Sequence, residues 1–306
     1  MNATTPSALA ALSTDLAAAV AAIGTSVVYV DAHPRRDASG IVWDDRHVVT
    51  VDHAIEREDD IELSLADGAK ARATLVGRDP STDVALLRSD TALHAAPHAD
   101  AAGLGVGHLV LAVGRDEDGM PGASLGIVSA LDGPWRTWRG GDVDRFVRPD
   151  LNVYPSFSGG PLVDLRGGVI GMNTWGLSRR TALTVPVSTL ARVVAQLQGG
   201  GRVARGYLGI AMQGVRLPES LRAAHGIAQS GAAIVVGVAP GGPADGALLI
   251  GDVLLALGTT ATEDSDDVAR ALAGIAIGST QTLRVVRGGE AREIAVTIGE
   301  RPHDDD

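Results

Sequence analysis

The sequence predicts a mostly β protein in which a double β-barrel is followed by a smaller α+β domain. From Ser26 to about Pro186, short β-branched runs alternate with turn clusters such as Asp67-Gly68, a pattern typical of barrels. Aromatic residues make up only 3% of the chain while glycine occurs 39 times, which favours aliphatic cores joined by tight turns. From Arg205 onward, strand patterns are mixed with helical ones.

Five segments follow from these patterns. Leu12, Leu16 and Val20 recur at i, i+4 spacing near the N-terminus, which predicts a helix. A second helix is predicted over Ser188–Gln198, and the glycine run after it is typical of a helix end and a hinge. The segments are a helical lead-in (1–24), the barrel domain (25–198), a Gly-rich linker (199–205), the α+β domain (206–302, with helices over 219–224 and 265–273) and an acidic tail (303–306).

Composition excludes several classes of function. With 26 basic against 37 acidic residues, the net charge is −11, which disfavours binding to nucleic acid or to anionic membranes. Cysteine is absent, so disulfides and thiolate metal sites are excluded. No His-Glu-x-x-His or nucleotide-binding loop occurs, and we therefore expect neither a metal nor an organic cofactor.

The segment Phe157–Val163 is the first candidate for chemistry. Its Ser-Gly-Gly-Pro sequence suits a nucleophile, Ser158, on a tight turn that leads into a strand, because glycine lets backbone approach a substrate closely. A plain hairpin turn explains the same four residues equally well. The upstream residues have to decide between the two interpretations.

Two upstream residues complete a His, Asp, Ser order. His53 follows the β-branched strand His47–Val51, where an imidazole can act as a base near neutral pH; His47 itself is expected to be solvated. Asp83 lies where the turn after Asp79 gives way to an apolar strand. A carboxylate there can orient a histidine, although Asp83 taken alone is better explained as a turn residue, a role expected of Asp79.

Several segments together resemble the HtrA (Deg) family of serine proteases. Val51–Ile55, Asp79–Leu87 and Ser158–Asp164 resemble the catalytic segments, and Gly206–Gly209 and Gly251–Leu254 look like parts of its PDZ domain. The resemblance runs from about Ser26 to about Pro302. It implies a chymotrypsin-like pair of six-stranded barrels followed by a PDZ domain.

The resemblance also implies roles for individual residues. His53, Asp83 and Ser158 would form the catalytic triad, and the backbone N–H groups of Ser158 and Ser156 would form the oxyanion hole. The family has glycine where this chain has Ser156, and a Cβ makes that peptide harder to orient. Loss of one oxyanion donor would cost roughly 3–4 kcal/mol of transition-state stabilisation.

Substrate-binding residues are expected in both domains. In the protease domain the resemblance points to Asn152, Thr174, Trp175 and Gly176 as the pocket for the side chain before the cleaved bond, which lacks an acid and should prefer small or medium apolar groups. In the PDZ domain it implies a peptide C-terminus bound by the backbone of Leu208, Gly209 and Ile210, a loop shaped by Tyr207, and an apolar groove wall formed by Val268 and Leu272.

The expected function is therefore cleavage of unfolded or misfolded proteins through an acyl-enzyme. Two alternatives remain: a weak or inactive homologue that acts as a PDZ-based binding or chaperone module, favoured by Ser156, and an esterase, disfavoured because no Gly-x-Ser-x-Gly elbow occurs. By resemblance, a homotrimer is possible.

Location is predicted from the N-terminal composition. No Lys or Arg precedes Arg35, so a secretory n-region is missing, and the uncharged stretch Leu16–Val30 is shorter than the ~20 residues of a membrane-spanning helix. These observations predict a cytoplasmic protein without a membrane span. The family resemblance implies the periplasm instead.

Overall fold

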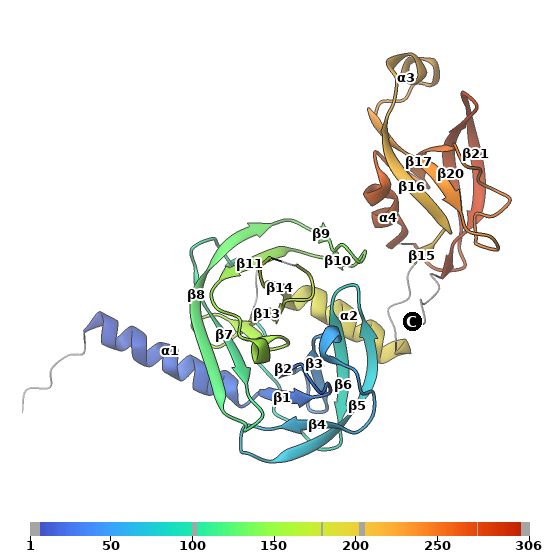
Figure 1. The fold of residues 1–306 in the computed structure, drawn as a ribbon. Helices are drawn as coiled ribbons and strands as arrows, with labels where there is room; N and C mark the ends of the chain where they lie inside the picture. Colours follow the sequence, from blue (N-terminus) through green and yellow to red (C-terminus); the bar gives the residue numbers. More distant parts are fainter. Residues whose placement is uncertain (1–6, 100–102, 179, 202–205, 274, 301–306) are drawn as a thin grey trace, which may run out of the picture. The chain divides into compact units, whose positions relative to one another are not determined.

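A computed structural model describes residues 7–99, 103–178, 180–201, 206–273 and 275–300 (Figure 1). The chain divides into two compact units, residues 1–203 and 204–306. The predicted linker residues 202–205 and the acidic tail 303–306 lie outside the described residues.

The first unit begins with a closed six-stranded barrel in the order β1-β2-β3-β6-β5-β4. All neighbouring strands are antiparallel, and the β-branched runs seen in the sequence fill the interior. Its strands are β1 (Val27–Asp31), β2 (Ala38–Val42), β3 (His47–Thr50), β4 (Ile61–Ser64), β5 (Lys70–Asp79) and β6 (Val84–Ser89).

A second six-stranded sheet follows, in the order β11-β8-β7-β12-β13-β14, and its two end strands, β11 and β14, lie side by side. The predicted pair of six-stranded units is thus confirmed. The strands are β7 (Leu109–Arg115), β8 (Pro121–Asp132), β11 (Phe146–Asp150), β12 (Pro161–Val163), β13 (Val169–Thr174) and β14 (Leu183–Pro186), with a short hairpin of β9 (Trp135–Arg136) and β10 (Asp142–Val143).

Two helices flank these sheets. Helix α1 (Ala8–Gly24) starts at Ser7, whose side chain accepts the N–H of Ala10, and Arg115 of β7 donates to the Gly24 carbonyl at 2.5 Å. Helix α2 (Val187–Gly200) ends at Gly201 in the left-handed region, φ 71°. The first two glycines of the expected linker are therefore helical, and only the third terminates the helix.

The second unit contains a five-stranded antiparallel sheet in the order β16-β17-β18-β20-β21. An apolar cluster of β-strand and α4 side chains forms its core. The elements are β15 (Gly206–Tyr207), β16 (Ile210–Arg216), α3 (Glu219–His225), β17 (Gly231–Val238), β18 (Val253–Leu257), β19 (Thr260–Ala261), α4 (Ser265–Ala273), β20 (Thr280–Arg287), β21 (Glu290–Thr297) and β22 (Gly299–Glu300). The expected helices coincide with α3 and α4.

Within the described part of the chain, no helix combines the length and the apolar character needed to cross a membrane.

Candidate active site

His53 and Asp83 meet at the end of the first barrel. His53 is the middle residue of the 3-10 turn η1 (Asp52–Ala54) that follows β3, and its side chain is 23% exposed. Its Nδ1 lies 2.9 Å from Oδ2 and 3.0 Å from Oδ1 of Asp83, and its backbone N–H donates to Oδ1 at 3.0 Å. The carboxylate therefore fixes both the ring and the backbone of His53, as a triad acid must.

The backbone at Asp83 is unusual because its φ is +58°, in a region that few residues other than glycine adopt. The turn before it is held by Asp79, whose carboxylate accepts the hydroxyls of Ser81 and Thr82 at 2.5 and 2.7 Å, as expected for a turn aspartate. This turn places the fully buried Asp83 side chain next to His53.

Thr174 and Gly176 pack against Asp83. The fully buried Thr174 hydroxyl donates to Asp83 Oδ2 and accepts the Gly176 N–H at 2.8 Å. A Cβ on Gly176 would overlap the Asp83 carboxylate. Thr174 is predicted to line a substrate pocket; in the structure its hydroxyl is turned to Asp83, so any contribution to a pocket would come from its backbone.

Ser158 follows the 3-10 turn η3 (Pro155–Phe157) and is 3% exposed. The Phe157 ring packs beneath the turn as expected, in space where a Cβ on Gly114 or Gly122 would overlap it. Ser39 of β2 supports the other side: its N–H donates to the Ser158 carbonyl at 2.8 Å and its hydroxyl to the Ser156 carbonyl at 2.5 Å. The serine is thus held between the two sheets of the unit.

The expected oxyanion hole is not formed in this structure. The N–H of Ser158 donates to the Pro155 carbonyl at 3.3 Å, so one of the two expected donors is already engaged. Pro155 opens η3 with its φ fixed by the ring, and a 3-10 turn closes through such an i to i+3 bond. None of the described residues accepts a hydrogen bond from the Ser156 N–H.

The hydroxyl of Ser158 also lacks its expected partner. No hydrogen bond joins Ser158 Oγ to His53; the hydroxyl accepts the N–H of Trp175 at 3.4 Å. Trp175 follows Thr174 directly, so the end of β13 brings Ser158 and Asp83 to the same place. Catalytic hydrogen bonds are often long in unliganded enzymes and tighten only when substrate binds.

The remaining pocket candidates are only partly brought together. The Trp175 ring is 43% exposed and donates from Nε1 to the Val153 carbonyl at 3.1 Å, so it is a surface side chain beside the serine and does not belong to the core. Asn152 is exposed and makes no hydrogen bond to the other site residues. His47, expected to be solvated, is half-buried and paired with Asp44 at 2.8 Å.

Sequence reasoning missed three contributors to the site. Ser39 and the role of Thr174 depend on contacts between residues 117 and 91 positions apart, for which the sequence carries no local signal. Arg78, which binds Asp52 beside His53, could have been noticed as a charged residue near the end of a half-buried strand.

Two family models match the chain: a trypsin-like peptidase domain over residues 38–172 and a PDZ domain over residues 206–298. Among curated proteins, the chain is 32% identical over 272 residues to a probable periplasmic serine endoprotease DegP-like of Pseudomonas putida, covering 87% of this chain and 56% of that one. A protein of the same description from Brucella suis is 36% identical over 285 residues, covering 89% and 54%.

Solved structures agree with these matches. An HtrA-type protease AlgW with a decapeptide has a TM-score of 0.78 at 26% identity, covering 94% of this chain and 99% of that one. A serine endoprotease of Yersinia pestis has a TM-score of 0.78 at 25% identity, covering 98% and 100%. The chain belongs to the HtrA family. It spans about half the length of the curated HtrA relatives it matches.

The predicted cytoplasmic location is contradicted by the HtrA relatives, which are named periplasmic. The prediction depended on the composition of the first residues, whereas these relatives match through both domains.

In the PDZ unit of this HtrA chain, a backbone loop precedes the edge strand β16. Gly209 has a φ of +74°, and none of the described residues accepts the N–H groups of Leu208 or Gly209. Their carbonyls are occupied by Ala244 and Ala239 at 2.9 and 2.7 Å. Free N–H groups beside a positive-φ residue are suited to a carboxylate.

The structure places both residues of the predicted groove wall inside the unit. Val268 is fully buried and Leu272 is 8% exposed, both within the core of the unit. The i, i+4 pattern identified the apolar face of α4 but not that this face turns inward. Ile210 and Met212 of the neighbouring edge strand β16 are only half-buried.

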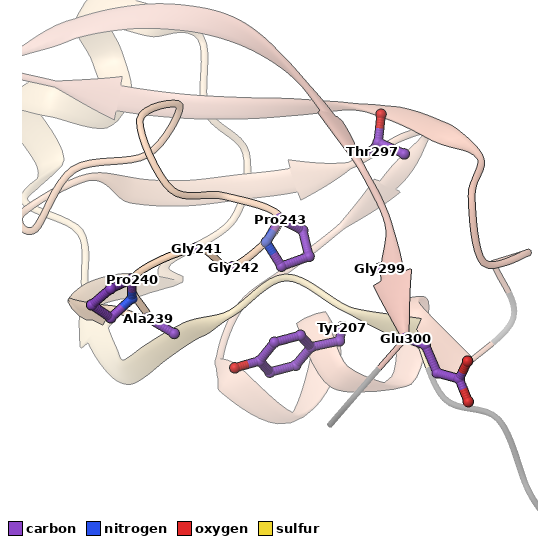
Figure 2. A pocket seen from close by; sticks show the side chains of 9 residues that line it. All are labelled: Tyr207, Ala239, Pro240, Gly241, Gly242, Pro243, Thr297, Gly299 and Glu300. Atoms are coloured by element: carbon purple, nitrogen blue, oxygen red, sulfur yellow. The ribbon is translucent and has the colours of Figure 1, made fainter. Parts of the chain in front are cut away.

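A hollow of about 570 Å³ lies next to the same loop (Figure 2). The Tyr207 side chain borders it together with the rings of Pro240 and Pro243. Pro243 also lies where a Cβ on Gly209 would come within 3.3 Å, so the loop is packed tightly from this side. The other lining residues are Ala239, Gly241, Gly242, Thr297, Gly299 and Glu300.

Proposed function

We propose that this chain is a serine endopeptidase of HtrA type that cleaves unfolded or misfolded proteins. The observation that carries the proposal is the convergence of three segments: His53 held by Asp83, Asp83 held by Thr174, and Ser158 bonded to the N–H of the residue after Thr174. Relatives that share both domains are named serine endoproteases, which supports the same activity here.

In the proposed mechanism, His53 removes the proton of Ser158 as the hydroxyl oxygen attacks the peptide carbonyl. Asp83 orients the ring through Nδ1 and stabilises the imidazolium that forms. His53 then protonates the leaving amine, and water hydrolyses the acyl-enzyme. Formation of the oxyanion hole requires the N–H of Ser158 to leave the Pro155 carbonyl, so substrate binding must be accompanied by rotation of peptides in η3.

We propose that the PDZ unit binds peptide C-termini. The carboxylate would be received by the N–H groups of Leu208, Gly209 and Ile210, and the peptide would extend β16, which is an edge strand of its sheet. Ile210 and Met212 would supply the apolar contacts in place of Val268 and Leu272. One structural neighbour is described as bound to a decapeptide, which supports a peptide ligand.

We propose a periplasmic location, which the names of the relatives support.

We also propose that the chain forms a homotrimer. This assembly is supported by apolar side chains exposed on the neighbouring strands β7 and β8. Leu109 and Ile127 are paired in register and are 37% and 38% exposed, and Leu125 is 49% exposed. Sedimentation of the purified chain tests this assembly.

The decisive experiment is degradation of casein at neutral pH by the wild type and by Ser158→Ala. We expect cleavage by the wild type and none by the variant. Cleavage that persists in Ser158→Ala would disprove the proposed nucleophile.

A second candidate function is a PDZ-based binding module with a weak or inactive protease unit. It is favoured by one observation, the engagement of the Ser158 N–H by the Pro155 carbonyl. No cleavage by the wild type, with or without peptides that bind the PDZ unit, would favour this function. The next variant would then be Ser156→Gly, which frees the peptide to rotate.

A further inference from the structure

The turn that carries His53 is too short to hold itself in place. Turn η1 has three residues, and the hydrogen bond from the Ile55 N–H to the Asp52 carbonyl at 3.0 Å closes it. Asp83 holds one side of the turn through the N–H and Nδ1 of His53. A single turn with so few internal bonds depends on its neighbours for a fixed position.

Arg78 supplies contacts to both ends of this turn. Its Nε donates to Asp52 Oδ1 at 2.5 Å, and its Nη2 lies 3.2 Å from the Asp52 carbonyl and 3.4 Å from the Ile55 carbonyl. The Asp52 side chain is 5% exposed, whereas that of Arg78 is 33% exposed. A guanidinium can make these contacts together because its donors are arranged as a planar fork.

Arg78 is close in sequence to Asp83 and close in space to the turn that carries His53. Arg78 pairs with Ala85 of β6 and directly precedes Asp79, whose turn leads to Asp83. Arg78 and Asp83, which are five positions apart on one continuous segment, therefore both contact the turn that carries His53. A shift of this segment would move the acid and the support of the base together.

We propose that the Asp52–Arg78 pair is a positioning device for the catalytic base, so that Arg78 fixes the His53 turn against Asp83. This inference rests on the proposed function of the site. The hydrogen bonds of Arg78 go to Asp52 and to the Ile55 carbonyl, so it would act through the backbone of the turn and not on the reacting atoms. The carboxylate of Asp52 holds the guanidinium in the orientation that these carbonyls need.

Electrostatics support this assignment. Burial raises the pKa of Asp52, the hydrogen bond and charge of Arg78 oppose that rise, and the nearby Asp83 charge adds to it. A second buried carboxylate next to the triad acid is unfavourable unless a cation accompanies it.

The test compares Arg78→Gln and Arg78→Lys with Arg72→Gln. Arg72 lies on the same strand and forms an exposed ion pair with Asp60, so it controls for loss of an arginine from β5. Steady-state cleavage of a peptide substrate gives kcat and KM separately. Histidine ring 15N spectra of the full chain, with the His53 signals assigned by His53→Gln, report the ring environment independently of activity.

We expect Arg78→Gln to lower kcat by roughly tenfold to a hundredfold with KM changed less than about twofold, because a misplaced base costs rate more than binding. Arg78→Lys keeps the charge but not the fork, and we expect a smaller loss of kcat. The His53 ring signals should shift in both variants and stay unchanged in Arg72→Gln.

Unchanged kcat and unchanged His53 signals in Arg78→Gln would overturn the inference. If Arg78→Gln does not fold, Arg78→Lys carries the same test. A wild type that does not cleave any substrate would refute the proposed function, while the ring signals would still show whether Arg78 positions His53.

Discussion

The two units each contain a buried aspartate paired with an arginine, and the pairs differ in what surrounds them. In the PDZ unit, Arg287 binds both carboxylate oxygens of Asp252 at 2.7 Å, and the carboxylate also accepts the Leu249 N–H at 2.8 Å. In the protease unit, Arg78 binds one oxygen of Asp52, and Asp83 lies close enough to affect its charge.

The pKa values of the two aspartates move in opposite directions. Burial alone would raise the pKa of Asp252, but the hydrogen bonds from Arg287 and Leu249 outweigh it and hold the pKa below its ordinary value. For Asp52, burial dominates and raises the pKa. The first pair stabilises its unit, whereas in the second the charge of Asp52 is unfavourable and lies beside His53, the proposed catalytic base. A buried ion pair is therefore informative about function when its neighbours, and not only its partner, are considered.

The largest effect is expected from replacing Asp83, the charged neighbour that distinguishes the Asp52–Arg78 pair from the Asp252–Arg287 pair. Asp83→Asn should lower kcat by about 10⁴, because an amide stabilises the wrong histidine tautomer. The fold should persist, since asparagine tolerates a positive φ at this position. Cleavage assays beside circular dichroism check both expectations; activity within tenfold of wild type would remove Asp83 from the triad.

A direct comparison of the pairs comes from Asp252→Asn and Asp52→Asn. Asp252→Asn should cost about 2 kcal/mol of unfolding free energy in the PDZ unit, because the buried carboxylate loses its charge-assisted hydrogen bonds to Arg287, whose side chain is 26% exposed. Asp52→Asn should change stability by less than about 1 kcal/mol, since burial already disfavours its charge. Hydrogen exchange followed by mass spectrometry resolves peptides of β18 from peptides of η1. Equal losses would contradict the comparison.

Gly176→Ala tests whether activity depends on the close packing of Gly176 against the Asp83 carboxylate. The added methyl group would overlap the carboxylate, and we expect kcat to fall by roughly a hundredfold through displacement of the acid. Gly199→Ala is the matched control, because a Cβ there has no neighbour within 4 Å. A Gly176→Ala variant as active as this control would show that the loop yields freely.

The smallest expected effect is on the pH dependence of stability, to which Asp252 and Asp52 contribute with opposite signs. The folded-state pKa of Asp252 is lowered, so its stabilisation is complete above about pH 4 and is lost as pH falls through the lowered value. The folded-state pKa of Asp52 is raised, so its favourable contribution is present at low pH and is lost as pH rises through the raised value. The difference in hydrogen exchange between the wild type and each Asn variant, measured between about pH 3 and 7, should show both trends. Trends of the same sign would refute the opposite pKa directions of the two aspartates.

Much of this architecture could be predicted because it depends on local patterns. Alternating β-branched runs set both six-stranded units, and the helix spacing near Leu190 and in Ser265–Ala273 set α2 and α4. His53, Asp83 and Ser158 could be predicted as a triad because each lies where a strand meets a turn, and the structure brings their segments together. Contacts between distant segments, such as Ser39 with Ser156, leave no such pattern.

Two features of the molecule depend on orientation, which the sequence does not show. The composition of Ser156–Ser158 suits an oxyanion hole, but which way a peptide points inside a three-residue turn is decided by Pro155 and by Ser39 from another sheet. In α4, spacing defines an apolar stripe without saying whether it faces the core or a groove. Sequence patterns identify faces and turns, and the surrounding structure decides their direction.

Trp175 gives the site an optical property. Trp175 is 43% exposed, its indole is held by the bond from Nε1 to the Val153 carbonyl, and its backbone N–H donates to the Ser158 hydroxyl. The fluorescence emission of a tryptophan moves to shorter wavelength when water is excluded from its ring. A peptide that covers this exposed residue would therefore shift its emission, so Trp175 would report occupancy beside Ser158 without a dye and without turnover.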